Sequence, residues 1–455
     1  MPRAQDLEEL VRLAIPVALV QVGIMAMGLV DTVMVGRVSS VDLAAVAVGN
    51  LYFFGVAVFG MGVLFALDPI FSQAVGADDD AAMARGVQRG GVLAAGLSVL
   101  AMLLMVPVGP LLEAARQPLE VIPVAAGYTH GLILGVFPFY GFVVLRQSLQ
   151  AMGRIRPIVL VVLAANVLNA VLNWMFIFGN AGLPAMGAVG SAWATTASRW
   201  FLMFALLVVA WPLLSRALSP LRRDALARRP LERILRLGAP VGVQQLLEFG
   251  VFGAAGLLMG LMGAVALASH QVALQLAALT FMVPLGVAQA TSVLVGRAVG
   301  RGETHAARRA TGAGVVIGVG FMTLTAVIFL TIPELLARGF SNDALVVATA
   351  AVLFPVAGVF QIFDGLQVVT AGALRGVGDT RVPMLMSLVG FWFVGLPVST
   401  WLAFGRGAGP VGIWWGLAIG LGVVSILLTL RVRRRFGRAL RRLVIDDDTD
   451  VALSA

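Results

Sequence analysis

The sequence has 455 residues, of which 60% are hydrophobic and 12% are charged, and its mean hydropathy is +0.97. Soluble globular chains carry about 25% charged residues, so this composition excludes water as the main solvent. Cysteine is absent, which excludes a disulfide framework, a thiol nucleophile and a thiolate metal site. The formal net charge is +9, and we expect the basic residues to set the topology of the chain in a membrane rather than to bind nucleic acid.

Twelve long apolar stretches follow one another along the chain, separated by short polar or Gly/Pro-rich breaks. A bilayer span needs roughly 20 mostly apolar residues, so each stretch can cross a membrane as a helix. A membrane β-barrel would alternate apolar and polar residues, but residues 92–108 and 315–330 are apolar on nearly every face. The predicted fold class is therefore an all-α polytopic membrane protein. The expected spans are residues 10–35, 43–67, 90–112, 121–145, 156–178, 187–212, 234–260, 265–294, 309–333, 344–371, 382–404 and 410–430.

Arginine placement predicts the orientation of these spans. Of the 32 basic residues, all arginine, 27 fall on the side of the two termini, 4 fall on the opposite side, and Arg199 lies inside the sixth span. The positive-inside rule then puts both termini in the cytoplasm of a cell whose plasma (inner) membrane holds the protein. The first span follows acidic residues and lacks a cleavage pattern, so we expect it to be a retained helix rather than a signal peptide.

The chain also repeats itself. A shift of 224 residues without gaps aligns Pro16 with Pro240, Gly62 with Gly286, and the tripeptide Ala-Val-Gly at 74–76 with the same tripeptide at 298–300. Six spans per repeat insert in the same orientation, so the two halves should be parallel lobes related by a pseudo-twofold axis along the membrane normal, with a site between them.

The repeat also divides the chain. We expect a monomer with four parts: a first six-helix lobe at 1–212, an Arg-rich cytoplasmic linker at 213–233, a second six-helix lobe at 234–430 and a cytoplasmic tail at 431–455.

Three acidic residues lie within predicted spans, where each costs a few kcal/mol. Glu248 lies 12 positions after Arg236, about 18 Å along the helix, and Asp364 lies 11 positions before Arg375, about 16 Å from the same surface. Asp31 lies in the outer half of the first span. Because a buried carboxylate can exchange a proton for a cation, these acids are candidate sites for a proton, a sodium ion or a cationic solute. The alternative is a structural ion pair or a hydrogen bond between helices.

Amides and one arginine join this set. Asn166, Asn169 and Asn173 recur at helical spacing on the fifth span, the last two on one face, and they either line a cavity or bond neighbouring helices. Arg199 either pairs with one of the acids or reaches toward the membrane surface. His270, Asp42 and Asp68 lie nearer helix ends, where a structural role is the simpler expectation.

Enzymatic motifs are missing from the sequence. The acidic run at 78–80 has no second carboxylate cluster with which to hold Mg²⁺ against a diphosphate, and the three histidines form no zinc motif. We therefore expect no enzyme and no cofactor. A membrane-embedded transferase and a lipid-linked oligosaccharide flippase remain as alternatives, although a flippase groove should hold several basic residues and Arg199 is the one arginine expected in mid-membrane.

Two segments resemble a known family. Residues 30–37 (VDTVMVGR), 66–69 (ALDP) and 73–77 (QAVGA) resemble the start of multidrug and toxic compound extrusion (MATE) transporters, and residues 371–383 (AGALRGVGDTRVP) resemble the matching part of their second half. The resemblance spans nearly the whole chain. The spacing of Glu248, Asp364 and Arg375 is similar to that in the NorM-type branch.

The resemblance implies a function. It implies export of cationic, amphipathic compounds in exchange for Na⁺ or H⁺, with Glu248 and Asp364 as cation-binding acids and candidate Na⁺ ligands, and with Asp31 as the helix-1 acid. Asn173 falls where other branches carry an aspartate, and Arg199 is not expected from the family pattern.

Overall fold

The structure is a computed structural model that describes residues 2–220 and 223–446. Arg222 of the predicted linker and residues 447–455 of the predicted tail lie outside this range. Its helices are α1 (Ala4–Val35), α2 (Ser40–Phe65), α3 (Leu67–Gly76), α4 (Asp80–Met105), α5 (Val108–Ala114), α6 (Val121–Ile133), α7 (Val136–Ala151), α8 (Arg156–Phe178), α9 (Gly187–Val209), α10 (Trp211–Leu218), α11 (Arg228–Leu261), α12 (Ala264–Gly300), α13 (Thr304–Thr331), α14 (Pro333–Arg338), α15 (Ala344–Gly376), α16 (Arg381–Ser387), α17 (Leu396–Thr400) and α18 (Gly409–Phe436). A 3₁₀ turn covers Arg223–Leu226, and π-helical segments at Leu388–Gly395 and Trp401–Gly405 complete the span that α16 begins.

Within the described residues, eleven helices are long and apolar enough to cross a membrane, and α6 with α7 forms a twelfth span that bends by 47°. This confirms the predicted polytopic all-α class. Several spans are longer than predicted on the side of the termini. The predicted ends at residues 145, 294 and 371 become Ala151, Gly300 and Gly376, and the span predicted to end at residue 67 continues through α3 to Gly76. The reason is that hydropathy marks where apolar residues stop, whereas a helix continues into polar sequence as long as its backbone hydrogen bonds are made.

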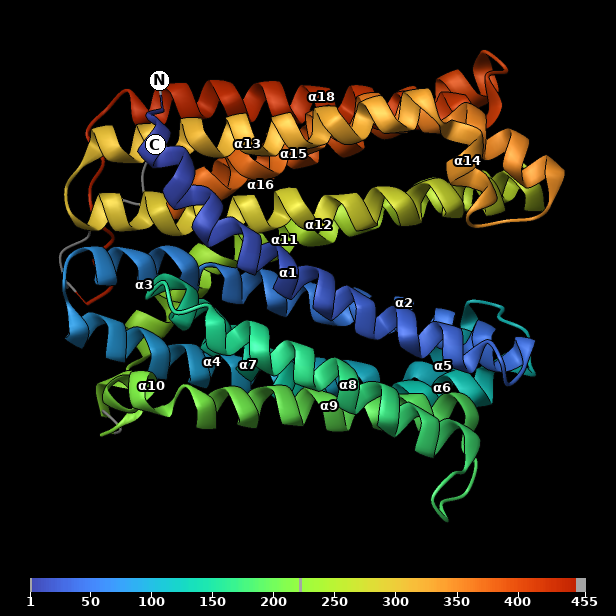
Figure 1. The fold of residues 1–455 in the computed structure, drawn as a ribbon, viewed down its shortest axis with the longest axis horizontal. Helices are drawn as coiled ribbons and strands as arrows, with labels where there is room; N and C mark the ends of the chain where they lie inside the picture. Colours follow the sequence, from blue (N-terminus) through green and yellow to red (C-terminus); the bar gives the residue numbers. More distant parts are fainter. Residues whose placement is uncertain (1, 221–222, 447–455) are drawn as a thin grey trace.

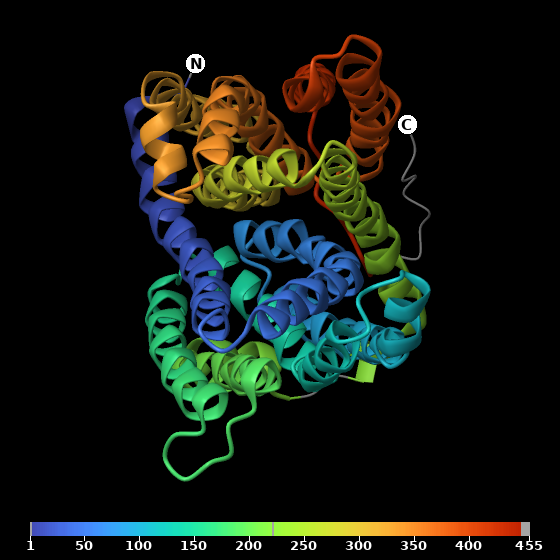
Figure 2. The same ribbon diagram turned by 90° about the vertical axis from the view of Figure 1, so that its right-hand side faces the viewer.

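The helices form two bundles side by side, a first lobe of α2 to α10 and a second lobe of α12 to α18 (Figures 1 and 2). Helices α1 and α11 cross from one lobe to the other. The start of α1 packs in the second lobe at Leu10 and Ala14, and the rest packs in the first lobe around Val20. In α11 the order is reversed, because Leu237 packs in the first lobe and Val251 in the second. Each lobe therefore holds one half of the other repeat's first helix.

Close glycine contacts follow the 224-residue repeat. A Cβ built on Gly62 would collide with the backbone of Gly242 on α11, and one built on Gly286 would collide with the backbone of Ala18 on α1. Residues 62 and 286, like 18 and 242, are 224 positions apart. The same contact is thus made twice, once by each repeat, as a pseudo-twofold axis requires.

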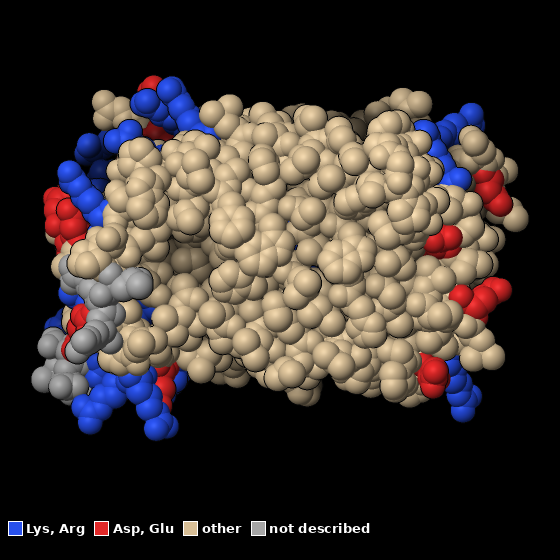
Figure 3. Space-filling view, turned by 90° about the horizontal axis from the view of Figure 1, so that it is seen from below, with Lys and Arg blue, Asp and Glu red and all other residues tan. Residues whose placement is uncertain are grey.

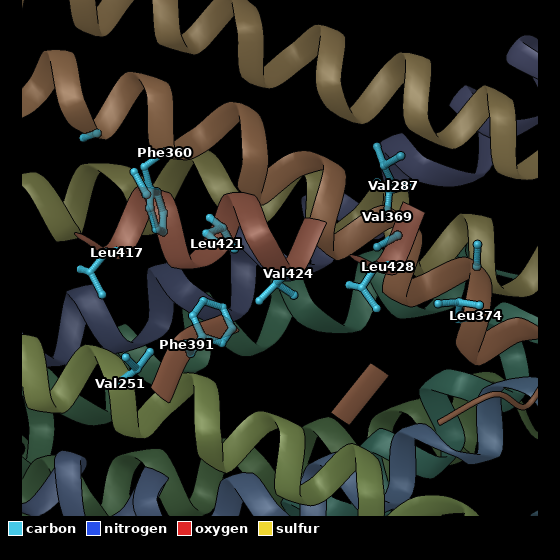
Figure 4. Packing of buried hydrophobic residues seen from close by; sticks show 14 of the residues in the cluster. Val251, Val287, Phe360, Val369, Leu374, Phe391, Leu417, Leu421, Val424 and Leu428 are labelled. Atoms are coloured by element: carbon cyan, nitrogen blue, oxygen red, sulfur yellow. The ribbon is translucent and has the colours of Figure 1, made fainter. Parts of the chain in front are cut away.

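Apolar side chains fill both the interior and the lateral surface. The core of the second lobe brings Phe360 of α15 and Leu421 of α18 together with Val251 and Phe391 (Figure 4). On the face shown in Figure 3, charged side chains gather at the two ends and a broad band between them carries none. Exposed leucines such as Leu103 and Leu257 belong to membrane-spanning helices, and a lipid environment explains their exposure.

Candidate functional site

A cavity of about 320 Å³ lies between the two lobes, near the points where α1 and α11 cross. Apolar and aromatic side chains form most of its exposed wall, although nearly half of the lining residues are polar or charged. Such a mixture suits a small organic molecule that carries polar groups. Asp31 and Glu248 line it, whereas Asn169, Asn173 and Asp364 are not part of its wall. The lining includes Gln21, Asn50, Phe54, Phe139, Arg146, Thr195, Arg199, Gln245, Phe281, Gln367 and Arg375.

Asp31 is buried in the first lobe, where neutral donors hold both of its carboxylate oxygens. Its Oδ1 accepts a hydrogen bond of 2.5 Å from the Nδ2 of Asn173, and its Oδ2 accepts one of 2.7 Å from the hydroxyl of Thr195. The amide of Asn173 also donates to Asn169 at 3.1 Å, so the predicted pair of asparagines lies behind the acid. Asn166 instead donates to the carbonyl of Val162 in its own helix.

Glu248 faces the cavity from α11, where the helix passes between the lobes. Its Oε1 accepts two hydrogen bonds, one of 3.0 Å from Gln244 and one of 2.9 Å from Gln367 of α15. Both bonds end on the same oxygen. The carboxylate is therefore oriented by neutral amides, and no arginine of the described residues pairs with it within 4 Å.

Asp364 lies on α15, three residues before Gln367. It has no hydrogen bond or ion pair with any of the residues described, and the nearby carboxylate of Glu248 repels it electrostatically. The two acids predicted to act together are thus neighbours, but the cavity wall includes Glu248 alone. In the described part of the chain, no three His, Cys, Asp or Glu side chains converge as metal ligands, so a bound cation would also need neutral oxygens or water.

Arg199 enters the cavity from α9. Its guanidinium carbon lies 4.2 Å from the ring centre of Phe53 and 5.2 Å from that of Phe139. Its buried Nη1 has no hydrogen-bond partner among the described residues. Arg199 and Asp31 line the same cavity but form no ion pair within 4 Å.

Two further arginines line the cavity besides Arg199. Arg146 donates to the side chain of Gln21 at 2.6 Å, and Arg375 forms an ion pair of 3.5 Å with Asp68 of the first lobe. Both lie past the predicted span ends, on helices α7 and α15 that continue beyond those ends and line the cavity. Asp68, predicted to be structural, joins the two lobes.

The lobes touch at the end of the molecule that holds the termini. A Cβ on Gly76 of α3 would collide with the backbone of Arg297, and one on Gly300 would collide with the carbonyl of Gln73. Residues 73 and 297, like 76 and 300, are repeat partners, so this crossing of α3 with the end of α12 is also pseudo-symmetric. Across it, Gln73 donates to the carbonyl of Gly376 at 2.9 Å, and Arg297 donates to that of Ala151 at 2.6 Å.

The segment that follows α18 packs against the first lobe near this contact between the lobes. The backbone nitrogen of Leu443 donates to Gln73 at 2.7 Å, and Arg442 pairs with Asp79 at 2.7 Å. Asp446 pairs with both Arg85 and Arg89 at 2.6 Å. The chain of the second lobe is thereby fastened to α3 and α4 of the first.

The remaining sequence candidates have local roles. Asp42 accepts a hydrogen bond of 2.7 Å from the backbone of Ala188, which holds the start of α2 against the start of α9. His270 is buried against Trp414, with ring centres 5.7 Å apart. Sequence reasoning missed Gln244, Gln367 and Thr195. Helical spacing was a usable signal for Gln244, which lies four residues before Glu248.

Two parallel six-helix lobes with crossing first helices and a cavity between them define a polytopic transporter built from repeats. The MatE family model matches residues 16–175 and 240–401, two segments that begin 224 residues apart. The chain belongs to this family, the multidrug and toxic compound extrusion (MATE) transporters, as the resemblance implied.

Individual relatives agree with this assignment. The chain is 37% identical to the multidrug resistance protein NorM of Burkholderia vietnamiensis, with 92% of each chain covered. It is 33% identical to the multidrug resistance protein MdtK of Edwardsiella ictaluri, covering 94% of this chain and 95% of that one. A crystal structure of the eukaryotic MATE transporter AtDTX14 has the same fold, with a TM-score of 0.87 at 23% identity over 94% of this chain and 95% of that one.

Proposed function

We propose that this protein is a multidrug antiporter that exports cationic, amphipathic compounds from the cell in exchange for Na⁺ or H⁺. One observation carries the proposal. Glu248 presents a carboxylate with no arginine within 4 Å to a cavity that lies between the two lobes. Relatives named for multidrug resistance support the same reading.

The chemistry of Glu248 supports exchange. An anionic carboxylate in a low-dielectric cavity is costly without a cation, so it favours occupancy by a proton, a sodium ion or a cationic group. Asp364 adds a second negative charge within electrostatic reach, which strengthens the attraction for a cation. Because a driving ion and a cationic solute meet the same carboxylates, each displaces the other. We assign Asp31, with Asn169 and Asn173 behind it, to the solute side of the cavity.

The direction of transport follows from orientation. With both termini in the cytoplasm of the inner membrane, the contacts at Gly76 and Gly300 hold the lobes together at the cytoplasmic end, where Asp379 and Thr380 also line the cavity. Loading from inside then widens the cavity at this end as the lobes part. A monomer suffices for this cycle, because both lobes and the cavity belong to one chain.

Reconstitution into liposomes tests the proposal. Efflux of a cationic dye is measured first under an imposed sodium gradient and then under an imposed proton gradient. We expect one of the two gradients to drive dye movement against its own concentration gradient. Absence of driven transport under both gradients, with protein inserted and folded, would contradict antiport.

A further inference from the structure

Arg199 is a cation without a polar partner in the middle of the molecule. It lies 12 residues into α9, and the groups against its guanidinium are the rings of Phe53 and Phe139. Aromatic faces attract a guanidinium but leave its N–H donors unused. The buried Nη1 has no hydrogen-bond acceptor among the residues described. A charged side chain inside the membrane without a hydrogen-bond acceptor costs free energy, and such residues usually have a functional role.

Asp31 attracts Arg199 electrostatically but does not accept a hydrogen bond from it. Its two oxygens accept from Asn173 and Thr195, which are neutral, and no ion pair within 4 Å joins it to Arg199. The other arginines of the cavity differ from Arg199, since Arg146 has Gln21 and Arg375 has Asp68. The cavity therefore presents a guanidinium without a hydrogen-bonded acceptor among the described residues, Arg199, and a carboxylate without an arginine within 4 Å, Glu248; Asp31 and Arg375 act on these two groups only at longer range.

We propose that Arg199 binds the anionic group, such as a carboxylate, of transported compounds that carry one, and so determines how tightly the cavity binds them. This inference rests on the proposed function and names a specificity-determining residue for it. The cationic end of the compound meets Glu248 and its carboxylate meets Arg199, while its apolar body lies against the aromatic wall. A guanidinium suits this role because it donates two parallel hydrogen bonds to one carboxylate while its face stays on an aromatic ring.

Two dyes that differ at one group provide the test. Rhodamine 110 carries a cationic ring system and a free carboxylate, and rhodamine 123 is its methyl ester, which is purely cationic. Binding of each dye to purified protein is measured by fluorescence polarisation. In Arg199→Gln we expect rhodamine 110 to bind about tenfold more weakly or worse, because a charge-assisted bidentate contact is lost, and rhodamine 123 to bind as in the unaltered protein.

A matched control is available in Arg406, whose guanidinium lies 4.9 Å from the ring centre of Trp401 outside the cavity. Arg406→Gln removes the same kind of contact and should change neither affinity. Arg199→Lys keeps the charge but loses the planar fork, so it should weaken rhodamine 110 to a smaller extent than Arg199→Gln. If Arg199→Gln does not fold, the same comparison of the two dyes in Arg199→Lys decides the question.

The outcomes separate this inference from the proposed function. Equal weakening of both dyes, or no change in either, would overturn the role of Arg199 while leaving export of cations intact. If the unaltered protein binds neither rhodamine 110 nor rhodamine 123, both the proposed function and this inference are overturned.

Discussion

The hydrogen bonds to Glu248 end on one oxygen, which makes an amide an informative replacement. In Glu248→Gln the amide oxygen can accept from Gln244 and Gln367 as Oε1 does, so we expect the variant to fold with an unchanged melting temperature. It cannot carry the negative charge that a cation requires. Driven efflux should therefore fall about tenfold or more, a change worth at least roughly 1.4 kcal/mol. Glu334→Gln, on an exposed pair outside the cavity, is the control.

Asp364 calls for a different expectation, because it has no partner among the described residues and is repelled by Glu248. Asp364→Asn removes that repulsion, so the melting temperature should stay constant or rise. Binding of a cationic dye to purified protein should depend less on Na⁺ or H⁺ concentration than it does in the unaltered protein. Asp343→Asn makes the same substitution at the start of the same helix, where asparagine also caps well. Unchanged dye binding and efflux in Asp364→Asn would leave Asp364 a structural group.

Sequence alone singled out Asp31 and Glu248, which line the cavity, and the neighbouring Asp364, but not the groups that donate hydrogen bonds to the first two. Asp31, Glu248 and Asp364 stand out because charge is rare and costly inside a membrane span. Thr195 and Gln367 do not stand out, because a single neutral polar residue in an apolar helix is common. Their contacts join α9 to α1 and α15 to α11, so they depend on how helices pack, which the spacing along one helix does not encode.

Among the helices, hydropathy and the internal repeat predicted the number of spans and the two lobes. Neither signal predicted the crossing of α1 and α11, because the crossing depends on which neighbours each half of the helix packs against, and hydropathy along one helix does not encode its neighbours. The bend between α6 and α7 was also missed. Gly135 precedes it and Pro138 follows it, but such residues occur in straight membrane helices too.

The crossing of α3 with the end of α12 gives a prediction for these elements. Gly76→Ala and Gly300→Ala each place a methyl group against the facing backbone, so they should hold the lobes apart at this end. Because the chain has no cysteine, Ala371→Cys in the cavity wall provides a unique thiol. We expect a membrane-impermeant maleimide added on the terminal side to label this thiol faster in either glycine variant.

The control for this experiment is Gly96→Ala, since nothing lies within 4 Å of a Cβ built there. It should leave the labelling rate unchanged. Equal labelling rates in all variants would mean that the two glycines do not close the cavity.

For the molecule as a whole, the arginine distribution predicts which end faces the cytoplasm. Helix α1 begins and α18 ends at the same end of the bundle (Figure 1). A green fluorescent protein fused after Ala455 should therefore be fluorescent, and alkaline phosphatase at the same position should be inactive. Alkaline phosphatase inserted at Gly182, in the loop between α8 and α9 at the other end, should be active. The reverse pattern would invert the topology and the direction of transport.

The segment after α18, which joins the second lobe to α3 and α4 of the first, must release these contacts before the lobes can part at that end. Its ionic contacts depend on two carboxylates outside the membrane. Burial acts to raise the pKa of Asp446, but hydrogen bonds and charge from Arg89 and Arg85 hold that pKa below its usual range. The backbone N–H of Ala82 and the guanidinium of Arg442 likewise lower the pKa of Asp79.

These directions fix how docking of the tail depends on pH. Asp446, whose pKa is lowered by the contacts of the docked state, stabilises that state fully above its undocked pKa, about 3.9 for an aspartate. Asp79 adds only the part due to Arg442, because its hydrogen bond from Ala82 remains when the tail leaves. The contribution is lost as the pH falls through the lower, docked pKa. A spin label on Val444→Cys, an exposed position in the tail, should therefore show little mobility at pH 7 and high mobility at pH 2.5 to 3.

Single substitutions should release part of the tail at neutral pH. Asp79→Asn keeps the hydrogen bond that caps α4 but loses the charge opposite Arg442, while Asp78→Asn makes the same change at a neighbouring carboxylate with no ion pair among the described residues. Partly exposed pairs contribute about 0.2–1 kcal/mol, so the mobile fraction should rise at most about fivefold in Asp79→Asn and not at all in Asp78→Asn. If release of the tail eases opening, Asp79→Asn should also speed labelling of the thiol in Ala371→Cys from the terminal side. A mobile tail with an unchanged labelling rate would mean that the lobes part without it.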